Sequence, residues 1–128
     1  MSHLFTPIAL RGLDMPNRIV VAPMCQYSAI DGVAQDWHLI HYGSLAASGP
    51  GMIVLEATAV APEGRISPAC LGLWNSEGEA ALARLVAALK KVGGSRVTVQ
   101  LNHAGRKADG GWPTVAPSAV PFDDGSPE

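Results

Sequence analysis

Three short apolar runs in this chain each end in residues suited to chemistry rather than to packing. The runs cover residues 18–21, 52–55 and 97–99. The polar or reactive segments that follow them are 22–27, 56–59 and 100–107. Strands that read as continuous apolar runs are buried on both faces, as in parallel sheets covered by helices. Ligands of such folds bind beyond the carboxyl ends of the strands, where these polar segments fall.

The spacing of apolar positions predicts a small hairpin followed by elements in the order β-α-β-α-β. Two short segments, 8–10 and 13–15, flank Arg11-Gly12, which places a glycine in the hairpin turn. The expected parallel strands cover about 18–22, 52–57 and 97–101. Such alternation is typical of an α/β fold with a parallel sheet.

The helix between the second and third strands has the clearest signals. Ser76 and Glu79 match a capping box, and Gly93 provides a stop. Between them, an apolar stripe at helical spacing is formed by Leu82, Leu85, Val86 and Leu89. A less regular helix is expected over 37–47, with Asp36 as its cap.

The chain is short for the fold that this alternation suggests. A closed eight-stranded α/β barrel needs roughly 250 residues, and this chain has 128. Three parallel strands also leave two unpaired edges, which favour aggregation. We therefore expect a second polypeptide or a missing segment to complete the sheet. From Gly110 onward, prolines and the run Asp123-Asp124-Gly125-Ser126 predict an irregular surface loop.

Composition excludes several classes of partner. The formal net charge is −2, and the only adjacent basic pairs are Lys90-Lys91 and Arg106-Lys107, so we expect no nucleic-acid partner. No apolar run reaches the ~20 residues of a membrane helix, and the N-terminus lacks the pattern of a signal peptide. Cys25 and Cys70 show no paired spacing and are expected as free thiols of a cytoplasmic protein.

Several residues carry chemistry but also have ordinary structural explanations. On the residues alone, Cys25 is best explained as a small buried side chain, and Tyr27 fits a loop as well as a ligand contact. Gln100 is more informative, because its amide would be costly in an apolar strand if unpaired. His38 and His41 lack a third metal ligand at suitable spacing, so packing or surface roles are expected, with no metal.

Seven linked motifs, in order and at compatible spacing, cover nearly the whole chain. They are Phe5-Thr6-Pro7-Ile8, Pro16-Asn17-Arg18-Ile19-Val20, Ala22-Pro23-Met24-Cys25-Gln26-Tyr27, Glu56-Ala57-Thr58-Ala59-Val60, Pro62-Glu63-Gly64-Arg65-Ile66, Gln100-Leu101-Asn102-His103-Ala104-Gly105-Arg106-Lys107 and Ala116-Pro117-Ser118-Ala119. Together they resemble the N-terminal third of the old yellow enzyme family. The segments 23–27 and 103–107 point to its thermophilic-like bacterial branch, which includes xenobiotic reductases.

The resemblance implies a flavin-containing (β/α)8 TIM barrel whose bottom is closed by an N-terminal β-hairpin. Residues 1–128 then form the N-terminal portion of one barrel domain, about strands one to three and the following loop. The implied cofactors are FMN and NADPH or NADH. The implied activity is ene-reduction, in which flavin N5 takes a hydride from NAD(P)H and passes one to the β-carbon of an alkene activated by a carbonyl or nitro group. A homo-oligomer of the completed enzyme is also implied.

The resemblance assigns roles to individual residues. It implies that the cofactor-binding residues are Ala22, Pro23, Met24, Cys25, Ala57 and Gln100. It implies catalytic roles for Tyr27, which contacts the substrate, and for Cys25, whose thiol modulates the flavin. Structural or accessory roles are implied for His103, Arg106 and Lys107. Trp112 is expected near the substrate entrance. If Glu56 is buried, we expect it to satisfy backbone groups or Arg65 rather than to act as an acid.

Two alternatives remain open. The first is another flavin-barrel oxidoreductase, such as a dienoyl-CoA reductase or an amine dehydrogenase, whose iron–sulfur cluster is bound by cysteines in a later segment. The second is a non-catalytic half-barrel that acts only as a structural or assembly module. The substrate-oxygen ligands and the flavin-phosphate loops of the family are implied to lie outside this chain.

Overall fold

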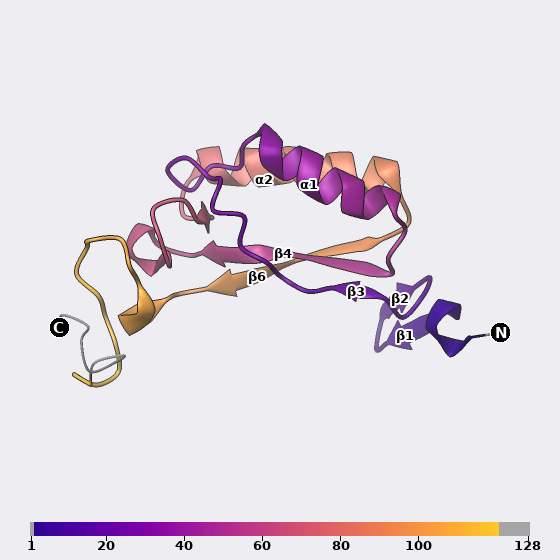
Figure 1. Ribbon diagram of the computed structural model, residues 1–128, viewed down its shortest axis with the longest axis horizontal. Coiled ribbons are helices and arrows are strands. Elements are labelled where there is room, and N and C mark those ends of the chain that lie inside the picture. Colours follow the sequence, from indigo (N-terminus) through magenta and orange to yellow (C-terminus); the bar gives the residue numbers. More distant parts are fainter. Residues whose placement is uncertain (1, 121–128) are drawn as a thin grey trace.

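A parallel sheet covered on one face by two helices forms the centre of the protein (Figure 1). The computed structural model describes residues 2–120. The covering helices are α1 (Asp36–Ala47) and α2 (Ser76–Val92). The strands of the sheet are β3 (Val20–Val21), β4 (Met52–Ala59), β5 (Leu71–Gly72) and β6 (Arg96–Asn102). The predicted α/β class and the predicted order of elements are therefore confirmed, and β5 is an addition.

Strand β4 is the centre of this sheet. Strand β6 pairs with it in parallel from Met52 to Ala59 and occupies one whole edge. Strands β3 and β5 therefore share the other edge, β3 at residues 52–53 and β5 at residues 58–59. The two strands predicted at 52–57 and 97–101 are longer in the structure by one or two residues at their ends.

The strand predicted at 18–22 is shorter than expected, because a proline follows it. The backbone N–H of Met52 donates to the carbonyl of Ile19 at 3.2 Å, and in a parallel ladder every second residue faces the same neighbour. After Val21, the next residue to face β4 is Pro23, which has no N–H to donate. The chain leaves the edge of β4 there, and β5 takes up the vacated edge further along.

The predicted hairpin is confirmed as β1 (Ile8–Leu10) and β2 (Leu13–Met15), paired antiparallel. Its turn differs from the expected one, because Arg11 rather than Gly12 has a positive φ, of 53°. The hairpin lies at the amino ends of the strands, at the right of Figure 1. Arg96 at the start of β6 attaches it there, because the Arg96 Nε donates to the Asp14 carbonyl at 2.6 Å.

The N-caps of both helices lie one residue before the predicted caps, which are the first helical residues instead. Asn75 caps α2 in place of Ser76, with its Oδ1 accepting a hydrogen bond from the Gly78 N–H at 2.8 Å. Gln35 is the N-cap of α1 in place of Asp36, and its N–H donates to the His38 Nδ1 at 2.9 Å. In both cases the cap has an extended backbone, which an N-cap requires, whereas the predicted cap is already helical.

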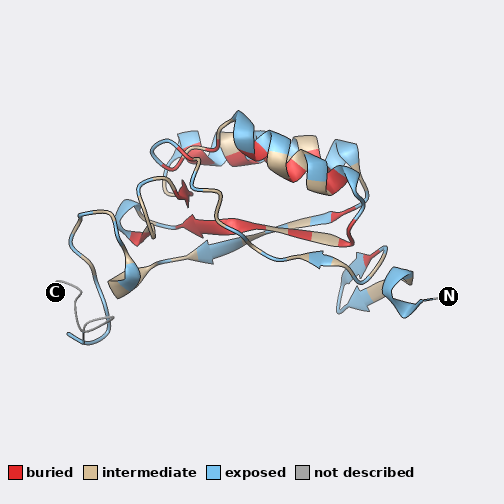
Figure 2. Ribbon diagram, viewed as in Figure 1, coloured by how far each residue is buried: buried red, intermediate tan, exposed pale blue. Residues whose placement is uncertain are grey.

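The core lies between the helices and the covered face of the sheet (Figure 2). Its largest members are Tyr42 of α1, Ile53 and Leu55 of β4, and Leu82, Leu85 and Leu89 of α2. The apolar stripe predicted for α2 is thus its buried face. On β6 the exposed residues include Thr98 and Gln100, whereas Val97 and Val99 pack against the core. The opposite face of the sheet is therefore open.

Beyond β6 the described chain has little regular structure, as expected. The short 3-10 helices are His3–Phe5, Pro62–Gly64 and Gly105–Lys107. Arg65 lies between two indole rings, 5.3 Å from the centre of Trp74 and 4.8 Å from the centre of Trp112. The predicted loop residues 123–126 lie outside the described part of the chain.

None of the helices within residues 2–120 is long and apolar enough to span a membrane.

Leu85→Ala should destabilise the protein by about 2–5 kcal/mol, because Leu85 is a fully packed core residue whose truncation leaves a cavity. Val92→Ala, at the exposed end of the same helix, should change stability by no more than about 0.5 kcal/mol. Urea denaturation of both variants measures the difference. Equal losses would show that α2 is not packed as described.

Candidate functional site

The predicted site residues meet at the carboxyl ends of the strands. Ala57 of β4 and Gln100 of β6 are direct partners in the parallel ladder. Cys25, in the segment between β3 and α1, has its thiol beside the backbone of Ala57 and the thiol of Cys70. The Tyr27 hydroxyl lies beside Cys25 in turn. Three segments that are distant in the sequence therefore supply one cluster.

This cluster is open to solvent on one side. Ala22, Met24, Tyr27 and Gln100 are exposed, and Tyr27 retains 57% of its accessible surface. Pro23 and Cys25 are half-buried, and Ala57 is buried. Tyr27 has a φ of 50°, a conformation that is unusual for an aromatic residue. The segment 22–27 therefore exposes Ala22, Met24 and Tyr27, whereas the Gln26 amide is held by the Met24 carbonyl and the Trp37 indole.

Gln100 is not buried as an unpaired amide, contrary to the reasoning from the sequence. Its side chain is exposed, because nothing within residues 2–120 covers that face of β6. Within the same residues its amide makes no hydrogen bond, so both its donor and its acceptor are available to a ligand. Because Gln100 is exposed, its amide does not pay the cost of a buried unpaired group, so that argument for a ligand does not apply. The amide can still donate and accept hydrogen bonds.

A β-bulge in β4 changes the face of the sheet on which the residues after it lie. The ladder runs from Leu55 opposite Val99 to Ala57 opposite Gln100, which leaves Glu56 without a partner on β6. A bulge inserts one residue and shifts the facing of all that follow. Glu56 consequently turns toward α1, and Ala57 lies on the same face as Gln100.

Glu56 is fully buried and its polar groups are held by α1 and by the segment 22–27. The Tyr42 hydroxyl accepts a hydrogen bond from the Glu56 N–H at 2.9 Å and donates to Glu56 Oε1 at 3.2 Å. The backbone N–H of Gln26 donates to Glu56 Oε2 at 2.9 Å. The expectation that Glu56 satisfies backbone groups is confirmed. Arg65 is not its partner, since that guanidinium donates to the carbonyls of Pro62 and Pro68.

His38 lies on the other side of the same carboxylate. Its Nε2 is 3.5 Å from Glu56 Oε1, and its ring is fully buried. Burial lowers the pKa of His38 below its ordinary value of 6.5, so the ring is neutral at neutral pH. Within residues 2–120 no cluster of three metal-binding side chains occurs. His41 packs against the rings of Trp37 and Tyr42.

Both candidate catalytic groups hold their protons at neutral pH. Burial raises the pKa of the Cys25 thiol, the nearby Cys70 and Glu56 raise it further, and the Ala57 backbone opposes the rise. The neighbouring Cys25 raises the pKa of the Tyr27 hydroxyl. A raised pKa disfavours a thiolate nucleophile at Cys25. Both side chains are therefore suited to donating hydrogen bonds.

Sequence reasoning missed Tyr42 and Cys70 as parts of this region. The pair His38 and Tyr42 is spaced i, i+4, which places both on one face of a helix, and a buried acid on the facing strand could have suggested a polar network. Cys70 precedes β5, a two-residue strand with no readable periodicity. Nothing in the sequence indicates that the two cysteines lie close together.

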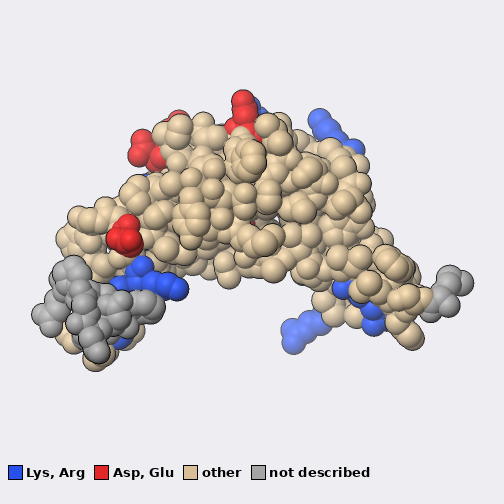
Figure 3. Space-filling model, viewed as in Figure 1, with Lys and Arg blue, Asp and Glu red and all other residues tan. Residues whose placement is uncertain are grey.

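Arg106 and His103, for which structural or accessory roles are expected, and Trp112 make hydrogen bonds within the chain. Arg106 donates to the Val120 carbonyl at 2.7 Å, and His103 Nδ1 accepts the Gly105 N–H at 3.1 Å. Trp112 Nε1 donates to the Glu63 carbonyl at 2.9 Å. Figure 3 shows Lys and Arg side chains at both ends of the lower side of the molecule, beside the hairpin and beside the segment after β6.

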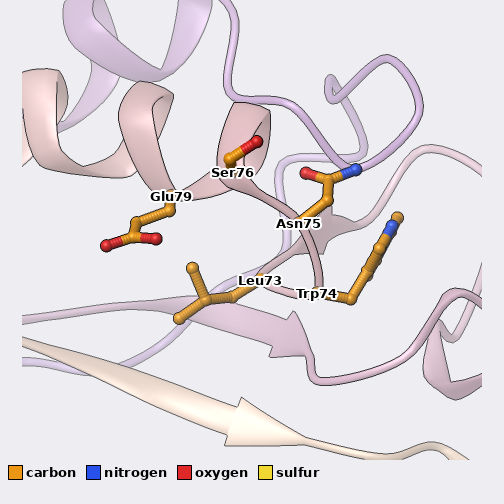
Figure 4. Close-up of a pocket in the computed structure, with 5 residues that line it drawn as sticks. All are labelled: Leu73, Trp74, Asn75, Ser76 and Glu79. Carbon is orange, nitrogen blue, oxygen red and sulfur yellow. The ribbon is translucent and has the colours of Figure 1, made fainter.

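A separate open pocket of about 570 Å³ lies at the start of α2 (Figure 4). It is lined by Leu73, Trp74, Asn75, Ser76 and Glu79. None of the predicted site residues lines it. The candidate site is instead an open surface at the strand ends.

The architecture is that of part of an α/β barrel, with a hairpin at the amino ends of the strands and the site at their carboxyl ends. The model of the NADH:flavin oxidoreductase / NADH oxidase family matches residues 3–125. The chain belongs to this family. The predicted old yellow enzyme resemblance is confirmed by structures of that group, which are similar to this chain.

Individual relatives agree with the family assignment. An NADPH dehydrogenase of Listeria monocytogenes serotype 4a is 52% identical over 128 residues, which are 98% of this chain and 38% of that protein. Morphinone reductase matches with a TM-score of 0.82 and 36% identity over 92% of this chain and 32% of that one. Old yellow enzyme from Pichia sp. AKU4542 matches with a TM-score of 0.77 and 30% identity, over 84% of this chain and 28% of that one. The chain thus spans about a third of the length of these relatives.

The prediction of FMN with NADPH or NADH as cofactors is confirmed at the level of the family.

Stability should fall as the pH drops below about 6.5, because the unfolded chain then takes up a proton that the buried His38 ring resists. Above about pH 7 this contribution is fully present. Chemical denaturation between pH 5 and pH 8 measures it, and His38→Asn should flatten the acid side of the profile. His103→Gln, which alters an exposed histidine, should keep the profile of the unmodified protein. An identical profile for His38→Asn would contradict the role of burial.

Proposed function

We propose that this chain supplies part of the FMN and substrate site of an NAD(P)H-dependent ene-reductase. The observation that carries the proposal is the exposed Gln100 amide on an open sheet face, opposite Ala57, whose backbone lies beside the Cys25 thiol. The family and the NADPH dehydrogenases among the relatives support a flavin and a nicotinamide nucleotide. One structure of morphinone reductase contains tetrahydroNAD, which supports a nicotinamide binding mode in that protein.

The residues at the strand ends fit a flavin ring. The Gln100 amide offers a donor and an acceptor, which matches the alternating edge of the flavin pyrimidine. Ala57 lacks a side chain beyond Cβ, so a flat ring can lie close to the backbone there. The segment Ala22-Pro23 has left the ladder of β4, which frees its backbone carbonyls for a ligand, whereas the Met24 carbonyl accepts a hydrogen bond from the Gln26 amide at 2.9 Å. When bound, the flavin supplies the transfer of a hydride from the nicotinamide to the β-carbon of the alkene.

Tyr27 and Cys25 then act as hydrogen-bond donors. The exposed Tyr27 hydroxyl is placed to donate to the carbonyl or nitro oxygen of a substrate, which withdraws electrons from the alkene. The Cys25 thiol keeps its proton and adjusts the electronics of the flavin through its contact rather than by covalent attack. Trp112 shapes the rim of the site, where it holds the segment after β6 against Glu63.

Further strands are needed to close the barrel. Strands β3 and β6 each leave one edge unpaired among the described residues. We propose that residues 1–128 are one portion of a single barrel domain, which additional sequence or a second polypeptide completes. The completed enzyme is proposed to act as a homo-oligomer on small activated alkenes. The cytoplasmic localisation remains a prediction.

Purification of the complete protein tests the function. We expect bound flavin, visible as its yellow absorbance, and NADPH oxidation that depends on an added enone or nitroalkene. A stoichiometric iron content together with enoyl-CoA turnover would favour the dienoyl-CoA reductase alternative. If the intact protein binds no flavin and oxidises no NADPH, the non-catalytic alternative is correct instead.

Gln100→Leu should weaken FMN binding about tenfold, because it removes a hydrogen-bonding group of about 1.5 kcal/mol while keeping the size of the side chain. Thr98→Val is the matched control, since Thr98 is exposed on the same face of β6 two residues earlier. Titration of the flavin-free protein with FMN, followed by flavin fluorescence, measures both. Equal affinities for the two variants would remove Gln100 from the flavin site.

A further inference from the structure

Glu56 is a fully buried acid to which the proposed reaction assigns no role. It lies directly beneath the site, between α1 and the open face of the sheet. Its neighbours in the chain and through hydrogen bonds are site residues, since Ala57 follows it and Gln26 lies between Cys25 and Tyr27. Burial raises the pKa of the Glu56 carboxyl, and the hydrogen bonds from the Gln26 N–H and the Tyr42 hydroxyl oppose that rise, so its protonation state depends on these donors.

The hydrogen-bonding pattern indicates that the Glu56 carboxyl is an acceptor only. The Tyr42 hydroxyl already accepts the Glu56 N–H, so its own proton is directed to Oε1. His38 Nε2 lies 3.5 Å from Oε1 without forming a hydrogen bond to it, and His38 Nδ1 lies 2.9 Å from the Gln35 nitrogen and 3.3 Å from the Gln35 carbonyl oxygen. Gln26 donates to Oε2. Each carboxyl oxygen of Glu56 therefore accepts one hydrogen bond, Oε1 from the Tyr42 hydroxyl and Oε2 from the Gln26 N–H.

We propose that Glu56 is ionised in the folded protein and is the positioning residue that holds the Cys25–Tyr27 segment against the end of β4. The two carboxyl oxygens of Glu56 hold different segments. Oε2 fixes the backbone at Gln26, between the two candidate catalytic side chains. Oε1, through Tyr42, fixes the bulge that turns Ala57 to the site. The benefit to flavin chemistry rests on the proposed function, whereas the positioning itself does not.

The same charge acts on the Cys25 thiol. The titratable groups that face this region are Tyr42 and His38 from α1, with His41 beside them, and Cys25, Tyr27 and Cys70 from the two adjoining loops. A negative charge nearby opposes formation of a thiolate, so Glu56 helps to keep Cys25 protonated. Removal of the charge should therefore make this thiol more reactive.

The test is the alkylation of Cys25 by iodoacetamide in the purified protein, quantified by peptide mass spectrometry so that Cys70 is counted separately. Glu56→Gln should raise the rate at Cys25 severalfold near neutral pH, because loss of the nearby negative charge lowers the pKa of the thiol and increases the thiolate fraction. Glu56→Asp keeps the charge and should restore most of the slow rate. Glu63→Gln removes an exposed acid and should leave the rate unchanged. An unchanged rate in Glu56→Gln would overturn the proposal.

Positioning is measured separately by hydrogen exchange of the Gln26 amide, which should accelerate at least about tenfold in Glu56→Gln and not in Glu63→Gln. If Glu56→Gln fails to fold, the carboxyl carbon of Glu56 in the unmodified protein decides the matter by ¹³C NMR. We expect the chemical shift of a carboxylate at pH 7, and that of a protonated acid would refute the inference. None of these measurements needs bound flavin, so their outcome is independent of the proposed function.

Discussion

The hydrogen bond between the backbone N–H of Glu56 and the Tyr42 hydroxyl is the contact on which the site depends. A bulge in a buried central strand leaves one N–H without a ladder partner, which costs about 1–3 kcal/mol if nothing replaces it. Tyr42 replaces that partner from α1 and returns its own proton to the carboxylate. The bulge is thereby tolerated in the middle of the core. Because of it, the strand can present an acid to the helices and, one residue later, a small alanine to the site.

The two faces of the sheet consequently differ in what they contact. Helices α1 and α2 bury Ile53 and Leu55 and fix β4 in place. The opposite face carries Gln100, which is exposed and whose amide forms no hydrogen bond among the described residues. Support thus comes from one side and ligand access from the other. This arrangement suits a site at the carboxyl ends of parallel strands, where side chains from several strands converge without interrupting the sheet.

The regular elements could be predicted because their signals are local. The stripe Leu82, Leu85 and Leu89 and the apolar runs of β4 and β6 each specify their own structure. The caps were displaced by one residue because Asn75 and Ser76 are both good caps, and only backbone geometry distinguishes them. The length of β3 could in principle have been read from Pro23. The bulge at Glu56, and the approach of Cys70 to Cys25, depend on pairing between distant segments and leave no local signal.

The exposure of Gln100 differs from the burial that the apolar run of β6 predicts. Whether a strand residue is buried depends on what covers its face of the sheet, and the described chain covers only the face toward the helices. The helix side of β6, with Val97 and Val99, is packed as the pattern indicates. The other side carries Thr98 and Gln100, a polar alternation that a strand with two covered apolar faces would not show. This alternation in β6 is therefore the better sequence signal for the site, because it identifies the face on which polar groups are required.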